Sequence, residues 1–226
     1  MIDNLIFKKY PEGNIMQWFG ENVELYKKSV CFGGQCLEKG HNGIDLVAPY
    51  GTPIKTALCD QKAVECRELT TGFGKYVKTV GELNGKTYEF TYGHLSEILI
   101  KVGDKLLKGQ ILGKMGNSGF VVSGNTPYWK YNPYAGTHLH FQIRELAKWQ
   151  GRGQFISYMT GEQYEVLDYE NGSFGAKDPM GLFVVKPETF TLPDITQLRL
   201  TIISLLNQIK NILRGKILER GAKPVV

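Results

Sequence analysis

Apolar and polar side chains alternate in short runs between residues 53 and 143, and glycines separate the runs. A period of two residues is the pattern of a β-strand with one buried face. The runs are also rich in β-branched and aromatic residues, which favour strands, and they show no helical period. We therefore expect a mainly β fold with an antiparallel sheet core and a two-layer groove. Its strands should lie within PIKTAL, KAVECREL, KYVKTV, KTYEFTYG, QILGKMG and HLHFQIR.

The C-terminal part of the chain has a different pattern. Turn signals at 151–153 and 178–179 predict irregular structure packed on the core over residues 145–190. Thr191 and Asp194 then have the spacing of a helix capping box, and apolar residues recur at steps of three and four until Gly215. We expect two domains, a body at 1–190 and a basic amphipathic helix at 191–226.

Composition and charge narrow the class of protein. The 226 residues are 42% apolar and include 3 Trp, 12 Tyr and 11 Phe, which suits a folded core and excludes a disordered chain. The net charge of +5 lies in residues 199–226, so the rest of the chain is neutral and no nucleic-acid partner is expected. No apolar run reaches the roughly 20 residues of a membrane span, and MIDNLIFKKYPEG lacks the apolar stretch of a secretory signal. Export by the usual route is therefore not expected.

The four cysteines do not have the CxxC spacing of a zinc ribbon or a thioredoxin-like site. Cys31 and Cys36 share one glycine-rich loop and could pair in an oxidising compartment. Free thiols in a reduced protein are the alternative for them and for Cys59 and Cys66.

All four histidines fall in three short motifs: His41 in HNGID, His94 in YGHLS, and His138 with His140 in THLHF. In a strand, His138 and His140 share one face, so one can bind a metal while the other acts as an acid or base beside it. HNGID adds the carboxylate of Asp45. Imidazole nitrogen and carboxylate oxygen are good zinc donors, and two histidines with one carboxylate leave a position for water, as in catalytic zinc sites.

HNGID, GHLS, the run VGDKLLKGQILGKMGNSG and HLHF resemble, in this order, the motifs of the lysostaphin/LytM-type zinc endopeptidases. The resemblance covers about residues 41–144, the expected motif core. It implies one Zn²⁺ ion per chain, held by His41, Asp45 and His140. It also implies that His94 and His138 are the two catalytic histidines.

The resemblance further implies an activity. Zinc would activate water, His138 would act as general base and His94 would stabilise the oxyanion, or the two roles would be exchanged. The implied substrate is bacterial peptidoglycan, cut in its peptide stems or cross-bridges, and the motifs do not name the bond.

Residues 120–136 form an insertion between GNSG and THLHF, where the family usually has a short connection. Because the insertion leads directly into the strand of His138 and His140, its aromatic residues are expected to form one wall of the substrate site. A self-packed loop is the alternative. The predicted substrate contacts are Tyr92, Asn117, Tyr128, Trp129, Tyr131 and Tyr134. For Tyr92, a structural role is the alternative.

Other functions stay open. A non-catalytic wall-binding module and a structural component of a phage tail are the alternatives to a cell-wall lysin. The helix at 191–226 suits packing on the body, contact with a second copy or a partner, or binding to an anionic membrane surface. The expected setting is a phage endolysin, made in the cytoplasm and acting on the cell wall after lysis or export by an unusual route.

Overall fold

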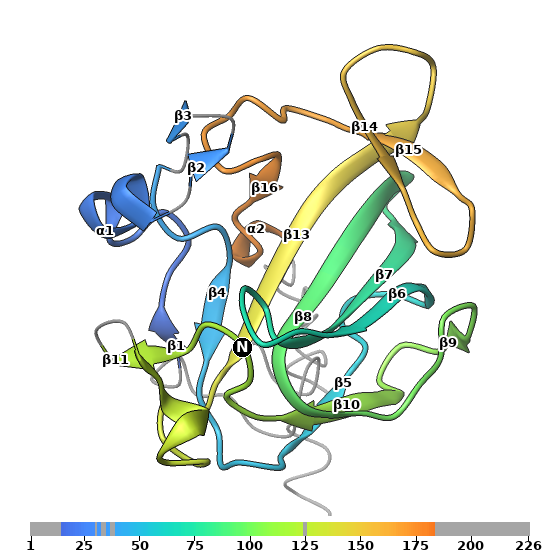
Figure 1. The fold of residues 1–226 in the computed structure, drawn as a ribbon. Helices are drawn as coiled ribbons and strands as arrows, with labels where there is room; N and C mark the ends of the chain where they lie inside the picture. The colour runs from blue at the N-terminus through green and yellow to red at the C-terminus, as the bar shows by residue number, and fades with distance from the viewer. Residues whose placement is uncertain (1–14, 30, 33–34, 37–38, 124–125, 184–226) are drawn as a thin grey trace, which may run out of the picture. The chain divides into compact units, whose positions relative to one another are not determined.

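A computed structural model of the protein describes residues 15–29, 31–32, 35–36, 39–123 and 126–183 (Figure 1). The chain divides into two units, Met1–Val184 and Val185–Val226. The helix expected at 191–226 and the domain boundary at 190 lie outside the described residues. Within the described part, no helix is long and apolar enough to cross a membrane.

One 12-stranded sheet forms the fold, and neighbouring strands in it are antiparallel in the described part of the chain. Figure 1 shows the central strands side by side, in the order β1-β4-β13-β8-β7-β6-β9. Their bounds are β1 Ile15–Gln17, β4 Ile44–Leu46, β13 Leu139–Lys148, β8 Lys86–Ile98, β7 Lys75–Leu83, β6 Gln61–Glu68 and β9 Lys105–Leu106. A mainly β, antiparallel fold is thereby confirmed.

Shorter elements complete the described part of the chain. β10 pairs with both β5 and β8, while β15 and β16 pair with β13. The two-stranded ladders β2–β3 and β11–β12 lie outside the main sheet. The bounds are α1 Val23–Ser29, β2 Cys31–Phe32, β3 Gln35–Cys36, β5 Pro53–Lys55, β10 Ile111–Met115, β11 Val122–Ser123, β12 Thr126–Pro127, η2 Tyr128–Lys130, β14 Gln154–Ser157, β15 Gln163–Val166, β16 Ala176–Lys177 and α2 Met180–Phe183.

The strands expected from the alternating pattern are all present, with ends that differ by a few residues. The β7–β8 hairpin illustrates the local cause. Its two-residue turn is Asn84–Gly85, and both residues have positive φ, 53° and 74°. That conformation matches the twist of the strands and favours the Asn-Gly pair.

The two faces of β13 divide as its alternation predicts. Leu139, Phe141 and Ile143 are buried in the main hydrophobic cluster, together with Phe90 and Tyr92 of β8. His138 and His140 therefore lie on the other face, where the sheet carries its polar residues.

The prediction of irregular structure over residues 145–190 is wrong in part. β13 continues to Lys148, and the β14–β15 hairpin pairs with it at Leu146. The hairpin covers a second hydrophobic cluster that includes Leu146, Tyr158 and Val166. Both strands are four residues long, and most of their residues are exposed or partly exposed. Pairing of β15 with β13 and of β14 with β15 stabilises them, and their own sequence pattern does not reveal this pairing.

A buried ionic network joins this hairpin to the sheet. The Glu89 carboxylate, 1% exposed, accepts hydrogen bonds from Arg144 at 2.7 and 2.6 Å and another from the Tyr158 hydroxyl. Lys78 Nζ lies 3.8 Å from it. Burial alone would raise the pKa of Glu89, but the charges of Arg144 and Lys78 and these hydrogen bonds lower it to about 2.

The four cysteines form two pairs of residues with different surroundings. Cys31 and Cys36 are direct partners across the β2–β3 ladder. A disulfide between them stays a prediction. Cys59 and Cys66 are free thiols, and burial raises the pKa of each.

Candidate metal centre

His41, Asp45 and His140 converge where β4 pairs with β13. Asp45 and His140 are directly opposite each other in that ladder, and His41 precedes β4. The three donor atoms form a triangle: His41 Nε2 and His140 Nδ1 each lie 3.1 Å from Asp45 Oδ1, and 3.0 Å from each other. All three residues are buried, with no more than 5% of each exposed. The sheet therefore brings together the three residues that the motifs singled out as metal ligands.

Hydrogen bonds fix the His41 ring and keep the Asp45 carboxylate ionised. The Trp18 carbonyl can only accept, so His41 donates to it from Nδ1 at 3.2 Å and turns Nε2 towards Asp45 and His140. Burial alone would raise the pKa of Asp45, but His138 and hydrogen bonds from His140 and His41 hold it well below its usual range. The triangle therefore combines an ionised carboxylate oxygen with two imidazole nitrogens, which is a donor set that suits a cation.

A glycine allows the His140 ring to reach its place. A Cβ atom added at Gly43 would lie 2.8 Å from two atoms of the His140 imidazole and 2.6 Å from the Phe141 carbonyl oxygen. Both distances are below ordinary contact. HNGID therefore needs its central glycine because the backbone of residue 43 packs against the ligand from β13.

Two further residues border the centre, and the motifs did not single them out. The Phe73 ring stacks on His140, with centroids 5.1 Å apart and planes at 27°, and its carbonyl accepts the His94 backbone N–H at 2.8 Å. Gln17 of β1 is directly opposite Asp45, and its buried Nε2 has no hydrogen-bond partner among the residues that the structure describes. Phe73 and Gln17 lie outside the histidine motifs, so only strand pairing and loop packing reveal them.

His94 and His138 lie beside the triangle, with ring centroids 4.7 Å apart. Each donates from Nδ1 to a backbone carbonyl, His94 to Ser118 at 2.8 Å and His138 to Gly136 at 2.7 Å. An imidazole that carries its single proton on Nδ1 presents Nε2 as an acceptor. His138 Nε2 lies 3.6 Å from Asp45 Oδ2. The His94 backbone has a φ of 60°, an uncommon conformation that aims the side chain away from regular strand geometry.

The electrostatics of the centre favour neutral rings. Burial, and then the neighbouring His138 and His140, hold the pKa of His94 well below its usual range. Burial also lowers the pKa of His140, although Asp45 opposes this change. A neutral His94 with Nδ1–H bonded to Ser118 cannot donate from Nε2. The donor role expected for His94 in oxyanion stabilisation therefore requires a protonated ring that this environment disfavours.

The predicted substrate contacts fall into two groups. Tyr92 is fully buried in the core, where its hydroxyl bonds to Ala57 N–H and Gln61 Oε1, in keeping with the structural alternative. Asn117 is 4% exposed and donates its amide to the Asn132 and Ala135 carbonyls. Asn117 thus holds the insertion against the end of β10.

The remaining four contacts belong to the insertion. Tyr131 and Tyr134 are exposed, at 58% and 67%, whereas Tyr128 and Trp129 are half-buried. The Trp129 indole donates to the Gly119 carbonyl at 3.0 Å. The insertion therefore has an anchored side and an open side, and it ends directly before His138.

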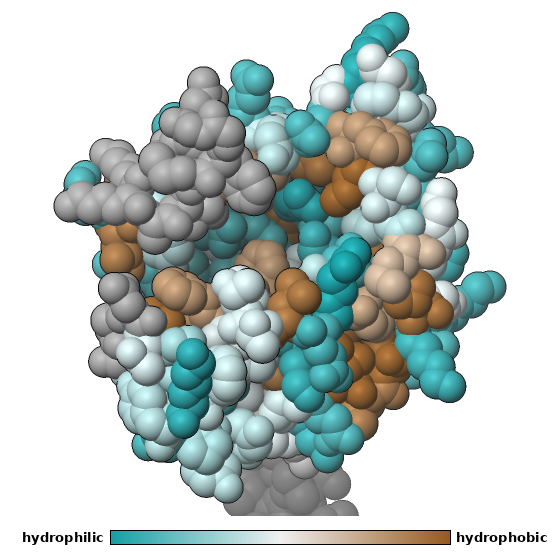
Figure 2. All heavy atoms as spheres, viewed as in Figure 1, coloured by the Kyte–Doolittle hydropathy of each residue, from teal (hydrophilic) through white to brown (hydrophobic). Residues whose placement is uncertain are grey.

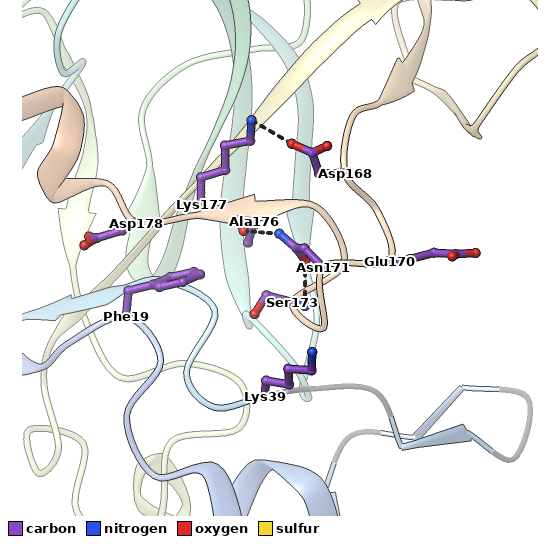
Figure 3. Close-up of a pocket in the computed structure, with 9 residues that line it drawn as sticks. All are labelled: Phe19, Lys39, Asp168, Glu170, Asn171, Ser173, Ala176, Lys177 and Asp178. Atoms are coloured by element: carbon purple, nitrogen blue, oxygen red, sulfur yellow. Dashed lines mark hydrogen bonds and ion pairs between the residues drawn. The ribbon is translucent and has the colours of Figure 1, made fainter.

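A cavity of about 710 Å³ is lined by none of the residues of this centre (Figure 3). Its walls come from three segments and carry charges of both signs. They are formed by Phe19, Lys39, Asp168, Glu170, Asn171, Ser173, Ala176, Lys177 and Asp178. Figure 3 shows Lys177 paired with Asp168, at 3.0 Å. The candidate metal centre is therefore identified by its converging donor atoms, and this cavity is a separate feature of the surface.

Known proteins provide independent comparisons. The chain is 37% identical over 103 residues to peptidoglycan DD-endopeptidase ShyA of Vibrio cholerae serotype O1, covering 46% of this chain and 20% of that protein. It is 31% identical over 129 residues to lysostaphin of Staphylococcus simulans, covering 56% of this chain and 22% of that protein. The chain therefore matches about one fifth of the length of these relatives.

A solved structure also aligns with the chain, and a family model matches it. The solved catalytic domain of lysostaphin from Staphylococcus simulans aligns with 74% of this chain and 98% of that domain, at 24% identity and a TM-score of 0.43. The family model for peptidase family M23 matches residues 39–162, more than half of the chain. The resemblance to the lysostaphin/LytM-type enzymes is thereby confirmed, and the chain belongs to peptidase family M23.

Proposed function

We propose that the protein is a zinc-dependent endopeptidase that hydrolyses peptide bonds in the stems or cross-bridges of bacterial peptidoglycan. The triangle of His41, Asp45 and His140 beside two acceptor histidines carries the proposal. The names of two relatives support the substrate class. One is the peptidoglycan DD-endopeptidase of Vibrio cholerae, and the other is a glycyl-glycine endopeptidase of Staphylococcus capitis, 32% identical over 120 residues.

The donor set suits one zinc ion per chain. Bonds of about 2.0–2.1 Å to a tetrahedral ion place ligand atoms about 3.3 Å apart, close to the 3.0 and 3.1 Å edges of the triangle. Two nitrogens and one oxygen are a catalytic zinc set. When bound there, zinc supplies a Lewis acid that polarises a carbonyl and acidifies water.

The two acceptor histidines provide the proton chemistry. We assign the base to His138, whose Nε2 takes the proton of the attacking water. Asp45 Oδ2, 3.6 Å away, stabilises the imidazolium that results. His138 then returns this proton to the leaving amine. His94, neutral and fixed by Ser118, accepts a hydrogen bond at Nε2 and so orients water or a substrate N–H.

Digestion of purified peptidoglycan tests the proposal. The protein is assayed as purified, after treatment with a chelator, and after zinc is restored, and mass analysis identifies the fragments. We expect peptide-bond cleavage that the chelator abolishes and zinc restores, with one zinc per chain by elemental analysis. A protein that binds zinc and leaves every peptide bond intact would refute the proposed activity.

A further inference from the structure

Two exposed tyrosines from separate segments meet edge to face on the surface of the protein. Tyr50 is 42% exposed and Tyr134 is 67% exposed, and their rings meet edge to face with centroids 5.1 Å apart and planes at 86°. We propose that Tyr50 and Tyr134, here called the tyrosine shelf, bind a saccharide unit of the glycan strand. This inference rests on the proposed function, because it takes peptidoglycan as the substrate.

Hydrogen bonds connect the two segments that carry the shelf to the backbone around His138. Tyr50 lies in the turn at residues 49–52, where Gly51 N–H donates to the Met115 carbonyl at 2.8 Å. The next residue after Met115, Gly116, accepts the His138 backbone N–H at 3.1 Å. From the other side, the Tyr134 carbonyl accepts the hydroxyl of Thr137, the residue before His138, at 2.7 Å. Both rings are therefore attached to segments that contact the residue assigned as base.

The chemistry of the shelf suits a sugar ring. Each tyrosine offers an apolar face and a polar tip, and neither hydroxyl has a hydrogen-bond partner among the described residues. Residues 126–136 contain one charged side chain, Lys130, whose Nζ lies 5.7 Å from the Trp129 ring centre. In Figure 2, residues of intermediate hydropathy cover this lobe, at the lower left. A neutral sugar with C–H faces and hydroxyl edges fits such a surface better than a charged stem peptide does.

Contacts with the body anchor the insertion that carries Tyr134. Asn117 donates to two carbonyls of the insertion, Trp129 donates to Gly119, and the Tyr128 ring lies against Gly136, where an added Cβ would be 2.8 Å from it. Tyrosine has few rotatable bonds, so little conformational entropy is lost on binding. An anchored loop that exposes aromatic rings is therefore suited to recognition.

Binding to glycan strands freed of their stem peptides tests the shelf. Titration calorimetry is performed with the full-length zinc-loaded protein and with Tyr50→Ala, Tyr134→Ala and the ring-preserving Tyr134→Phe. We expect each alanine variant to weaken strand binding by about tenfold, equivalent to about 1.4 kcal/mol, and Tyr134→Phe to retain most of the affinity. Circular dichroism and zinc content establish that each variant is folded.

The chain offers a matched control. Trp149 and Phe155 form another exposed edge-to-face pair, with centroids 4.7 Å apart. Trp149 is eleven residues beyond His138, about 35 Å along an extended strand. Phe155→Ala is expected to bind glycan strands like the unaltered protein.

The outcomes separate the two proposals. Strand binding that is equal in the unaltered protein and both alanine variants overturns the shelf, even if peptidoglycan is cleaved. Alanine variants that weaken binding of a sugar-free cross-linked peptide, and not of the strands, also overturn it. An unaltered protein that binds strands through these tyrosines and cleaves no peptide bond refutes the proposed function and leaves the shelf standing.

Discussion

Glu89 provides a direct test of how the buried network stabilises the fold. Its pKa is lowered from an ordinary value of 4.5 to about 2. At about 1.4 kcal/mol for each pKa unit, the ionised carboxylate contributes about 3 kcal/mol at neutral pH. Because the pKa of Glu89 is lower in the folded protein than in the unfolded chain, folding is stabilised only while the carboxylate is ionised. This stabilisation is present above pH 4.5 and is lost as the pH falls towards 2. At pH 3 about 1.4 kcal/mol should remain.

Urea unfolding of the unaltered protein and Glu89→Gln at pH 7 and pH 3 measures this contribution. Glutamine mimics the protonated side chain, so the variant should be less stable by about 3 kcal/mol at pH 7 and by less than half of that at pH 3. Glu97→Gln is the matched control, because Glu97 pairs with Lys114 at 2.7 Å while both side chains are about half exposed. Glu97→Gln should lower the free energy of unfolding by at most about 0.5 kcal/mol. If the two substitutions lower it equally, or if the effect of Glu89→Gln does not depend on pH, the assigned role of the Glu89 carboxylate is wrong.

Three further predictions concern the metal centre and the insertion that leads to it. Gly43→Ala should displace the His140 ring and weaken zinc binding about 10- to 100-fold, measured by competition with a chromogenic chelator; Gly181→Ala, with open space around it, should keep the affinity. His138→Ala should lower kcat about 10²- to 10⁴-fold with zinc content unchanged by elemental analysis, and loss of the metal would contradict the assigned role. Asn117→Ala should free the insertion and expose residues 120–136 to limited proteolysis, and a cleavage pattern like that of the unaltered protein would count against this anchoring role.

Some expectations from the sequence stay predictions. They include the helix at 191–226 and its partners, the phage origin, and the place where the protein acts. Digestion of cell walls and size measurement with and without residues 191–226 address them directly.

Local patterns were sufficient for the strands and the metal set. Strand alternation has a period of two, so HLHFQIR alone determines that His138 and His140 share a face and that Leu139 and Phe141 enter the core. The four motifs resemble those of a known family, and this resemblance selected His41, Asp45 and His140 as candidate metal ligands, which the fold brings together.

Tertiary packing decided the rest. The register of β4 against β13 places Asp45 opposite His140, and the closeness of Gly43 to the His140 ring follows from that pairing. Hydrogen bonds from the ring nitrogens of His94 and His138 to loop carbonyls determine which nitrogen faces the centre. Backbone carbonyls are the same in every residue, so no sequence pattern reveals which of them will accept. For the same reason, the burial of Tyr92, the anchoring by Asn117 and the meeting of Tyr50 with Tyr134 emerge only when distant segments fold together.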